Sequence, residues 1–541
     1  MRVSDRWQLR TVPADLVERY RANGWWSDTT LGALTAAASE QAGRNRFRVY
    51  SAERPWQGTC ADVDKLARSL AAALQKDGVS PGDVILLQMP NWAEAAVAFW
   101  AALYLGAVVV PVVHFYGAKE IDYILRAVEP DVVVTPDHFR GIDYLSTYEQ
   151  LIAGHPQARW VVAAEPGAAR TLPPNATPIE HLYDADPVDE AASVDPDSPA
   201  IVAFTSGTTS DPKGVVHTHH TIGAELGQMS SGALGGDIPA ILTGAPVGHF
   251  IGMLSAFLRP LMQESGVDLI DVWDPGTVLR LMLEEGLMFA GGATYFLTSL
   301  IDHPDFTPEH LRYMPMCGLG GSAVPLAIAE RASELGILVF RSYGATEHPS
   351  VTRSAPTDAE DKRLRTDGRA IDGVELRLDD EGQIWTRGPD LFMGYTDPDL
   401  TASVLDADGW YATGDVGVLD DEGYLTITDR VSDMIIRGGE NISAQEVEEL
   451  LLRMDGVGEV AVVAAPDNRL GEHAAAIMTV RPGVAAPSLD DVRTHLQSSG
   501  LARQKWPESL YVVGDLPRTA SGKVQKYRLR QQLREGSVTS T

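Results

Sequence analysis

Residues 84–113 read VILLQMPNWAEAAVAFWAALYLGAVVVPVV and decide the fold class. Two short apolar runs, 84–89 and 107–113, flank an apolar segment of helical length. Runs of this kind are typical of strands that are buried on both faces of a parallel sheet. A strand, a helix and a second strand in this order predict a βαβ unit with two parallel strands.

Residues 95–113 also have the character of a membrane span, because they carry no charge over a length that crosses a bilayer. Two features favour a buried helix and strand instead. Asn91 and Glu94 have the spacing of a helix N-terminus, and Gly106 is placed to end the helix before the next strand. We therefore expect a helix over 92–105 and no integral membrane span.

The same alternation continues on the C-terminal side of this stretch. A helical pattern over 118–128 precedes a strand-like run at 131–136. Further strand-like runs occur at 200–207, 266–273, 286–295 and 337–344. The succession predicts a mostly parallel sheet built from βαβ units.

The pattern changes twice toward the C-terminus. Turn-rich segments of alternating polarity, from about residue 366 to 428, predict antiparallel strands. After residue 430, shorter helical and strand-like segments predict a compact α+β unit. We therefore expect an α/β protein with a large N-terminal domain, residues 1–429, and a small C-terminal domain, residues 430–541.

The composition is that of a globular protein, with 44% hydrophobic and 22% charged residues among 541. A net charge of −30 argues against a nucleic-acid or anionic-membrane surface, because clustered Lys and Arg form such surfaces. The two cysteines, Cys60 and Cys317, are far apart and suggest neither a disulfide framework nor a zinc site. The N-terminus lacks the apolar core of a signal peptide, so we expect a cytoplasmic protein, monomeric or homodimeric.

Residues 204–220, FTSGTTSDPKGVVHTHH, follow a strand-like run and combine hydroxyls, glycines and a lysine. Backbone N–H groups and hydroxyls in such a loop bind phosphate, and Lys213 adds a positive charge. In a Walker loop, by contrast, the lysine follows the second glycine and precedes Ser or Thr. Here Lys213 precedes Gly214, so we expect phosphate binding in another class of nucleotide enzyme.

Five further motifs follow this loop in order: GLGGSAVP (318–325), SYGATEHP (342–349), YATGDVG (411–417), TDRVSDMIIRGGENISAQEVEE (428–449) and RTASGKVQKYRLR (518–530). The series resembles the adenylate-forming superfamily, which contains acyl-CoA synthetases, peptide-synthetase adenylation domains and beetle luciferases. The resemblance extends from roughly residue 30 to residue 530. It implies stacked βαβ subdomains, a β-barrel-like subdomain and a mobile C-terminal domain.

The resemblance also implies a reaction in two steps. The carboxylate of an acid attacks the α-phosphorus of ATP, which gives acyl-AMP and pyrophosphate, and a thiol such as that of coenzyme A then accepts the acyl group. The partners of the first step are both anions. The site must therefore neutralise charge and hold the two in line.

By resemblance, six residues of the first loop surround the β- and γ-phosphates: Thr205, Ser206, Gly207, Thr208, Thr209 and Lys213. The family usually has glycine at position 210, where this chain has Ser210, a residue that tolerates positive φ poorly. In GLGGSAVP, the resemblance implies close backbone approach to the nucleotide at Gly320, Gly321 and Ser322.

In SYGATEHP, the resemblance assigns Tyr343 to the adenine face, Thr346 to the α-phosphate and Glu347 to Mg²⁺, and it places Gly344 among the residues that bind ATP or AMP. Carboxylate oxygen is a ligand that Mg²⁺ prefers, and a metal that bridges phosphate oxygens reduces their repulsion of the acid. Thr346 and Glu347 are therefore candidate catalytic residues.

Three more candidates come from the later motifs. Asp415 and Arg430 match the aspartate and arginine that bind the ribose in this family. Lys523 matches the lysine that approaches the substrate carboxylate and the α-phosphate during adenylation, a role that suits a flexible ammonium group. The resemblance makes Lys523 the catalytic lysine of the C-terminal domain.

The family rotates its small domain between the two steps. The usual hinge residue is Asp or Lys, and this chain has Ser432 at that position, where a change of φ and ψ is all that a hinge requires. The rotation brings the segment with Arg437, Gly438 and Gly439 toward the CoA thiol.

The acyl site is predicted around His249, which matches an aromatic position that borders this site in the superfamily. Peptide-synthetase domains have an Asp nearby for the amino group, and aryl-acid enzymes have an Asn directly after the histidine. This chain has Phe250 instead, and the segment 291–301, with Gly292, is also apolar. An apolar wall favours a hydrocarbon acid. The segments RYRANGWWSDTTLGAL (19–34) and DHFRGIDY (137–144) resemble the branch that contains medium-chain and cyclohexanecarboxylate-type acyl-CoA ligases and their dihydroxybenzoate-activating relatives.

His217, His219 and His220 lie close together in sequence and raise the question of a metal site. A metal site requires convergent ligands, and enzymes of this kind use oxygen-bound Mg²⁺. We therefore interpret the three histidines as loop or helix-start residues.

Four functions remain open. A ligase that transfers the acyl group to CoA is favoured, because no carrier-domain segment follows the small domain in the sequence. The alternatives are a ligase that loads a separate acyl carrier protein, an aryl-acid–CoA ligase, and a nucleotide-binding protein without catalysis. The last is disfavoured by the presence of all the predicted charged site residues: Lys213, Glu347, Asp415, Arg430 and Lys523.

Overall fold

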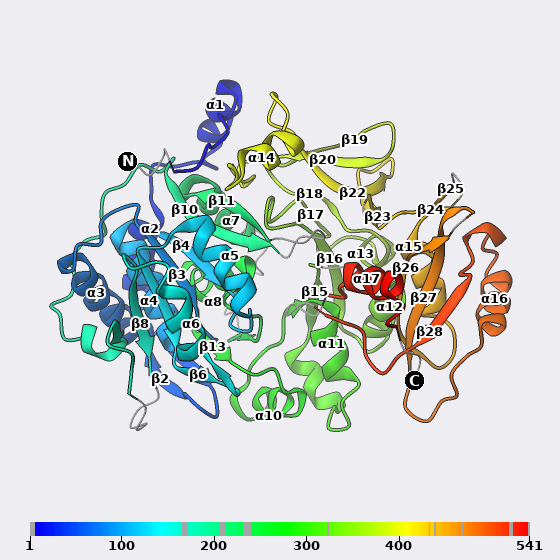
Figure 1. Cartoon of the computed structure of the whole chain (residues 1–541), viewed down its shortest axis with the longest axis horizontal. Helices are drawn as coiled ribbons and strands as arrows, with labels where there is room; N and C mark the ends of the chain where they lie inside the picture. Colours follow the sequence, from blue (N-terminus) through cyan, green and yellow to red (C-terminus); the bar gives the residue numbers. More distant parts are fainter. Residues whose placement is uncertain are drawn as a thin grey trace.

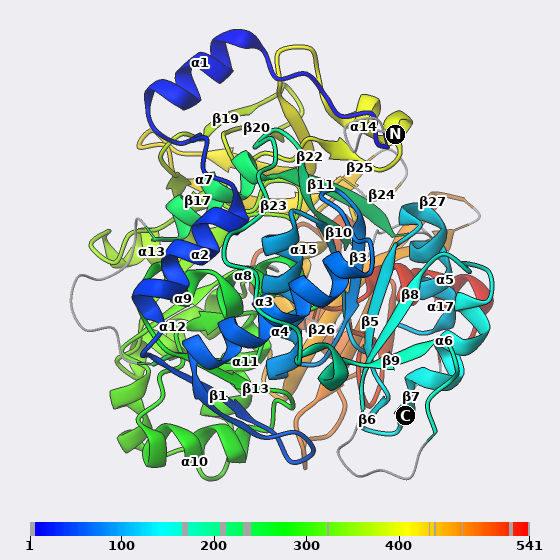
Figure 2. The ribbon, with the colours of Figure 1, turned by 90° about the vertical axis from the view of Figure 1, so that its left-hand side faces the viewer.

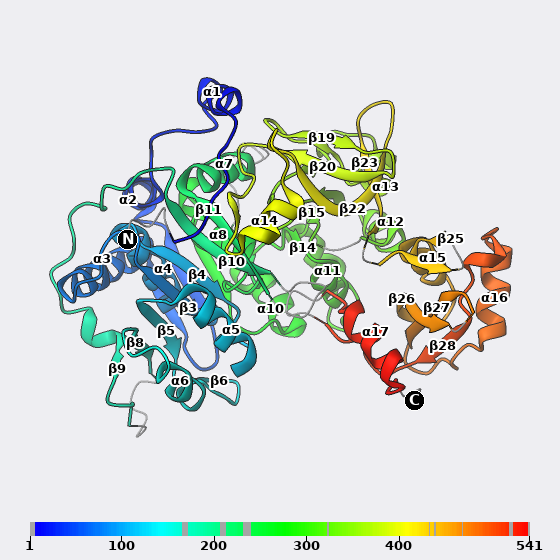
Figure 3. The same cartoon turned by 45° about the horizontal axis from the view of Figure 1, so that its top comes forward.

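The computed structural model consists of two lobes of unequal size, with the segment that follows residue 435 forming the small lobe at one end (Figures 1 and 3). The structure describes residues 6–164, 171–205, 212–230, 240–321, 324–431, 433–437, 440–467, 469–518 and 523–538.

An eight-stranded sheet forms the centre of the N-terminal part. Its parallel strands are, in order, β10 (Pro199–Thr205), β4 (Val108–Val112), β3 (Val84–Gln88), β5 (Val132–Pro136), β8 (Arg159–Ala163) and β9 (Ala176–Pro178). The antiparallel strands β11 (Lys213–Thr218) and β21 (Gly394–Tyr395) extend it beyond β10. All residues of β3 and β4 are buried, which confirms that the two apolar runs are strands of a parallel sheet.

Helices pack against this sheet in two groups (Figure 2). The first group is α2 (Leu31–Ala42), α3 (Cys60–Lys76) and α4 (Ala93–Leu105), and the second is α5 (Ala118–Val128) and α6 (Tyr144–Ile152). Helix α4 contacts β3 and β4 and ends at Gly106, which has a φ of +65°. The predicted helix is therefore confirmed, and no helix of the described residues combines the length and apolar character of a membrane span.

The predicted capping pair at the start of α4 is wrong. Trp92 occupies the N-cap position, and no side chain caps the helix. Asn91 instead ties distant backbone segments together: its Nδ2 donates to the carbonyls of Ala245 and Ile270, 3.0 Å away in both cases. Its Oδ1 accepts from the N–H of Val247 at 2.9 Å. Partners more than 150 residues away leave no local pattern.

Two smaller sheets complete the α/β part. One has the order β12 (Leu242–Thr243), β13 (Val267–Ile270), β1 (Arg46–Tyr50) and β2 (Trp56–Thr59). The other has the order β14 (Gly291–Gly292), β15 (Met316–Leu319), β16 (Leu338–Tyr343), β17 (Thr352–Arg353) and β18 (Arg369–Ala370). The neighbouring helices are α7 (His219–Ser230), α8 (Phe250–Phe257), α9 (Arg259–Met262), α10 (Pro275–Glu285), α11 (Thr294–Ile301), α12 (Leu326–Glu334) and α13 (Glu360–Arg365).

The strand predicted over 286–295 is much shorter in the structure, because only Gly291 and Gly292 form β14. Their φ angles are +131° and +141°, a region that favours glycine. A Cβ atom at Gly291 would lie 2.0 Å from the carbonyl oxygen of Gly318 on β15. Close backbone approach, and not a long strand, explains these glycines.

The antiparallel region is confirmed as a four-stranded sheet of β19 (Glu375–Leu378), β20 (Gln383–Arg387), β22 (Tyr411–Leu419) and β23 (Leu425–Arg430), with α14 (Pro398–Val404) beside it. The small lobe has a sheet of β25 (Glu440–Ile442), β24 (Ile435–Arg437), β27 (Gly471–Val480), β26 (Val457–Asp467) and β28 (Ser509–Val512). Its helices are α15 (Ala444–Leu451), α16 (Leu489–Ser498) and α17 (Lys526–Glu535).

The N-terminal segment, with α1 (Ala14–Ala22), runs beside the antiparallel region (Figure 2). The N–H of Arg10 donates to the carbonyl of Met393, and its Nε donates to the carbonyl of Phe392. The indole of Trp26 donates to the carbonyl of Pro389. The N-terminal segment therefore holds residues 389–393 through hydrogen bonds to their carbonyl groups.

The substitution Asn91→Ala tests the tie that replaces the predicted cap. It leaves two carbonyls and one N–H group without their buried partner, so we expect a loss of about 3 kcal/mol in the free energy of unfolding. Denaturant titration followed by fluorescence measures this loss. The matched control is Asn175→Ala at an exposed position. Equal stability of the two variants would contradict the role of Asn91.

Candidate active site

The motif at 342–349 forms a tight turn at the end of β16. The N–H of Ala345 donates to the carbonyl of His348 at 2.9 Å, and the N–H of His348 donates to the carbonyl of Ala345 at 3.1 Å. A Cβ atom at Gly344 would lie 1.9 Å from the carbonyl oxygen of Pro349, so the turn requires glycine there. Thr346 and Glu347 lie at the centre of this turn.

Glu347 is 9% exposed and is held by two contacts from residues 392–395. The hydroxyl of Tyr395 donates to Glu347 Oε1 at 2.7 Å, and the N–H of Phe392 donates to the Glu347 carbonyl at 2.8 Å. The ammonium group of Lys213 lies 5.4 Å from the centre of the Tyr395 ring. Tyr395 thus contacts both the predicted phosphate lysine and the predicted metal ligand. No motif in the sequence indicates this role of Tyr395.

Thr205 and Lys213 are register partners at the ends of β10 and β11. Antiparallel pairing therefore closes the phosphate loop at its base. Other predicted site residues lie outside the described part of the chain: Ser206, Gly207, Thr208, Thr209, Ser210, Ser322, Ser432, Gly438 and Gly439.

The interpretation of the three histidines needs a correction for His217. This residue lies on β11, is fully buried, and has its Nε2 2.7 Å from the carbonyl oxygen of Thr346. His219 and His220 begin α7, as predicted. Among the described residues, no group of three or more His, Cys, Asp or Glu side chains is arranged to hold a metal ion.

Asp415 and Arg430 face each other across β22 and β23 as register partners. The guanidinium Nε of Arg430 donates to Asp415 Oδ1 at 2.6 Å, and the hydroxyl of Tyr343 donates to Asp415 Oδ2 at 2.7 Å. Asp415 raises the pKa of Arg430, and burial together with Asp415 raises the pKa of Tyr343. The structure thus brings the predicted adenine and ribose residues together.

Lys523 of the small lobe approaches this group. The charge of Arg430, followed by burial, lowers the pKa of Lys523 to about 8, while Asp415 and Asp433 act in the opposite direction. Asp433 is itself bound to Arg530 at 2.7 Å. The predicted catalytic lysine therefore lies at the contact between the two lobes.

Gly320 and Gly321 follow β15 at a point where backbones lie close together. A Cβ atom at Gly320 would lie 2.7 Å from Ser342 Oγ, and Gly321 has a φ of +78°. Both positions therefore favour glycine for structural reasons, in addition to any contact with a nucleotide.

The predicted acyl residues His249 and Phe250 lie at the start of α8, with His249 as the N-cap residue. Burial lowers the pKa of His249 to about 4, and its Nε2 has no hydrogen-bond partner among the described residues. Phe250 is only 5% exposed, whereas the side chain of the next residue, Ile251, is 46% exposed. Contact of substrate with Phe250 and with Gly292 stays a prediction.

His114, after β4, is a neighbour of His249 that the sequence did not indicate. Burial and then His249 lower the pKa of His114 to about 4, so both imidazoles are neutral at physiological pH.

In the small lobe, the predicted CoA residue Arg437 forms an ion pair with Glu508, Nε to Oε1 at 2.5 Å.

Two protein-family models match the chain over most of its length. One, described as AMP-binding enzyme, matches residues 35–396, and the other, described as AMP-binding enzyme C-terminal domain, matches residues 446–523. The chain belongs to the AMP-binding enzymes.

This AMP-binding enzyme has relatives of similar length. It is 31% identical to the medium-chain fatty-acid–CoA ligase of Escherichia coli (strain K12), over 95% of this chain and 92% of that protein. It is 36% identical to a methyl-dioxo-octahydroindenyl-propanoyl:CoA ligase of Rhodococcus jostii (strain RHA1), over 88% of this chain and 93% of that protein. ATP-bound MatB from Rhodopseudomonas palustris superimposes with a TM-score of 0.83 at 25% identity, over 94% of this chain and 100% of that chain. These similarities confirm the predicted α/β fold with a large and a small domain.

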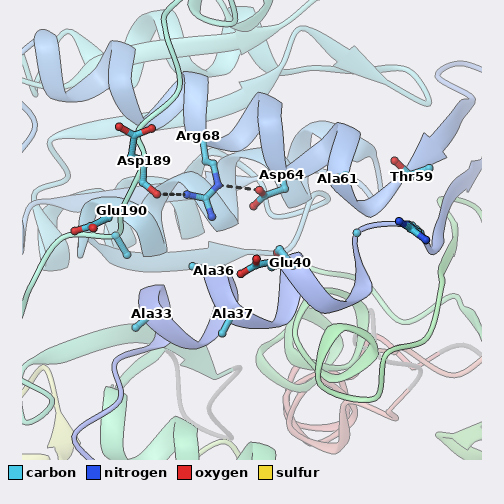
Figure 4. A pocket seen from close by; sticks show the side chains of 14 residues that line it. Ala33, Ala36, Ala37, Glu40, Thr59, Ala61, Asp64, Arg68, Asp189 and Glu190 are labelled. Atoms are coloured by element: carbon cyan, nitrogen blue, oxygen red, sulfur yellow. Dashed lines mark hydrogen bonds and ion pairs between the residues drawn. The ribbon is translucent and has the colours of Figure 1, made fainter.

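A cavity of about 970 Å³ lies between α2 and α3 (Figure 4). Arg68 in its wall donates to Asp64 Oδ2 at 2.8 Å and to the carbonyl of Asp189 at 2.9 Å. These polar groups bind one another, and none of the predicted site residues lines the cavity. The candidate active site of the AMP-binding enzyme is therefore the junction where Glu347, Asp415 and Lys523 lie.

The effect of Arg430 on Lys523 is testable in the free enzyme. The chain has only eight lysines, so ¹³C-methylated lysine resonances are few enough to assign by substitution. We expect Lys523 to titrate near pH 8 in the wild-type enzyme, and at higher pH in Arg430→Gln, because the largest cause of the lowered pKa is removed. The control Arg503→Gln, at an exposed position of the small lobe, leaves this titration unchanged. Titration of Lys523 near its ordinary pKa in the wild-type enzyme refutes the effect of Arg430.

Proposed function

We propose that this AMP-binding enzyme is an AMP-forming acid–CoA ligase. It activates a carboxylic acid with ATP as acyl-AMP, releases pyrophosphate, and transfers the acyl group to CoA with release of AMP. The curated relatives described above support the reaction class, since both are CoA ligases by name.

One observation supports the first step above all others: Lys523 of the small lobe lies beside the Asp415–Arg430 pair of the large lobe. An ATP molecule whose ribose binds Asp415 would have its α-phosphate near Thr346 and Lys523. The ammonium group of Lys523 would then neutralise charge between the carboxylate and the α-phosphate, which are both anions. A fixed geometry adds the advantage of alignment.

The remaining charged groups suit the two ends of the nucleotide. Lys213, at the base of the phosphate loop, would hold the β- and γ-phosphates that leave as pyrophosphate. Glu347 would hold Mg²⁺ together with phosphate oxygens and water, which is how Mg²⁺ is bound in many nucleotide enzymes. A single buried carboxylate, fixed by Tyr395, fits this mode, and the ion would supply charge neutralisation at the phosphates.

For the second step we propose a rotation of the small lobe about the predicted hinge Ser432, while Arg430 stays with the sheet of the large lobe. The rotation would remove Lys523 from the α-phosphate and bring the segment with Arg437, Gly438 and Gly439 to the CoA thiol. The ion pair of Arg437 with Glu508 belongs to the small lobe alone, and it would move with that lobe as a unit.

The acid is proposed to be apolar, of medium chain length or with a ring. Ile251, two residues after His249 on α8, is apolar and exposed, which supports a hydrocarbon group in this part of the site. The fatty acid and the fused-ring acid in the names of the two relatives belong to the same chemical class. A cytoplasmic location, a monomeric or homodimeric state and an acyl carrier protein as acceptor stay predictions.

The substitution Lys523→Ala separates the two steps. It removes the charge needed for adenylation, so we expect a loss of about 100-fold or more in acyl-AMP formation. Thioester formation from supplied acyl-AMP and CoA is expected to change little. The matched control is Lys505→Ala, which removes a lysine of the same lobe that pairs with Glu446. Equal losses in both steps would refute the proposed role of Lys523.

Mass spectrometry of the products tests the function itself. The purified enzyme is incubated with ATP, Mg²⁺ and one acid from a panel that contains octanoic, cyclohexanecarboxylic, salicylic and amino acids, with or without CoA. We expect an acyl-CoA from an alkyl or alicyclic acid. Pyrophosphate without a thioester favours a carrier-protein acceptor, and a salicylyl thioester favours the aryl-acid alternative. No turnover of any acid refutes the ligase proposal.

A further inference from the structure

His217 lies four residues after Lys213 on the same strand, β11. Alternate side chains of a strand share a face, so Lys213, Val215 and His217 point to the same side. Val215 packs in a cluster with Tyr395, whereas Val216 packs in the main core on the other side. His217 therefore faces the same side as the predicted phosphate lysine.

The imidazole of His217 makes three contacts. Its Nε2 is 2.7 Å from the carbonyl oxygen of Thr346, its Nδ1 is 3.1 Å from Thr221 Oγ1, and its ring stacks on Phe250 with 4.8 Å between centres. A carbonyl oxygen only accepts, so Nε2 carries the hydrogen. Burial lowers the pKa of His217 to about 4, and the ring is a neutral donor at physiological pH.

The contact with Thr346 fixes one side of the turn that carries the predicted catalytic residues. On the other side, the N–H of Phe392 holds the carbonyl of Glu347. The backbone of Thr346 therefore follows the imidazole of His217, since a buried carbonyl that loses its donor is unfavourable. A shift of the ring would move the Thr346 hydroxyl relative to the α-phosphate.

The contact with Phe250 connects the same imidazole to the proposed acid site. Phe250 is the first residue of α8 and directly follows His249, the predicted acyl-site residue. The two rings are nearly parallel, with an angle of 19°, and both are buried. In a densely packed interior, displacement of one ring requires movement of the other.

We infer that His217 is a positioning residue that couples the acid-binding side of α8 to the turn carrying Thr346 and Glu347. The inference rests on the proposed ligase function. An acid bound beside His249 restricts Phe250, and Phe250 in turn restricts the imidazole of His217. That imidazole holds the Thr346 carbonyl. The turn is then in the position for adenylation when the acid is present.

His220 provides a matched comparison for a purely structural histidine. It is also buried, it stacks on Trp26 with 4.7 Å between ring centres, and its Nδ1 is 2.9 Å from Asp197. No described contact joins it to the turn at 344–350. Removal of His220 should therefore affect stability without a specific effect on adenylation.

The experiment measures pyrophosphate release with the panel acid that gives the highest rate. The variants are His217→Leu, His217→Gln, Phe250→Leu, His220→Leu, and the two double variants that combine each Leu substitution at a histidine with Phe250→Leu. Leucine removes the donor to Thr346, whereas glutamine has a side-chain N–H that can replace Nε2–H. The kcat and the KM values for ATP and for the acid are determined for each folded variant.

We expect His217→Leu to lower kcat for adenylation by about 10- to 100-fold, with a change of less than about threefold in the KM for ATP. His217→Gln should recover at least about tenfold of that loss. Phe250→Leu should lower kcat in the same direction, and the double variant with His217→Leu should be no slower than His217→Leu alone, because both act through one contact. His220→Leu and Phe250→Leu should act independently, so the fold-changes that they cause in kcat should multiply in the double variant.

Three results overturn the inference while the ligase function stands: wild-type kcat in His217→Leu, an equal loss of kcat in His220→Leu, or independent effects of His217→Leu and Phe250→Leu. If His217→Leu does not fold, His217→Gln and Phe250→Leu form the cycle instead, and independent effects again overturn it. Absence of pyrophosphate release by the wild-type enzyme with every acid refutes the ligase proposal and this inference together.

Discussion

Asp415 and Arg430 form an ion pair near the contact between the two lobes. Each of the two charges makes the burial of the other more favourable. Their strands β22 and β23 place them opposite each other in register, so the pairing follows from the sheet itself. The pair orients Tyr343 through its hydroxyl and lowers the pKa of Lys523 through the charge of Arg430. The residues predicted to bind ribose and adenine, and the predicted catalytic lysine, thus depend on one interaction.

The same interaction matters because the chain as a whole repels its proposed substrates. The protein has a net charge of −30, and ATP and a carboxylate are both anions. Exposed charges are screened beyond about 8 Å at physiological salt, so the nearest groups determine the local potential. Arg430 acts on Lys523, and Lys213 lies beside Tyr395, which binds Glu347. At the proposed nucleotide site these few cations would be enough to reverse the local sign of the potential.

The sequence predicted the parts of the fold that rest on local periodicity. The strands β3 and β4 and the helix between them are apolar on all sides. The alternative to burial in the protein core was a membrane span, and no helix among the described residues has the length and apolar character of one. Asn91 was misjudged because its partners are backbone groups far along the chain. The predicted length of the strand at 286–295 is wrong because Gly291 allows two backbones to lie close together, and an apolar run contains no signal for such an approach.

The site followed a similar division. The motifs indicated the residues proposed to contact the nucleotide, such as Glu347, Asp415 and Lys523, because these stand in runs with a recognisable order. Of the two residues that hold the turn at Thr346 and Glu347, Tyr395 stands in no motif, and His217 resembles a loop or helix-start residue. Their function arises only when β11 and β21 pair beside the turn.

A signal for His217 was nevertheless present in the spacing of the strand. Lys213 must face the phosphates if the loop binds them, and a strand places residue i+4 on the same face as residue i. A polar side chain at position 217 therefore had to lie beside the nucleotide site or be buried against its wall. The structure shows the second case: the imidazole is fully buried, and its N–H group is used by the backbone of Thr346. The strand that carries Lys213, the predicted phosphate lysine, thus also supplies the donor that holds the adjoining turn.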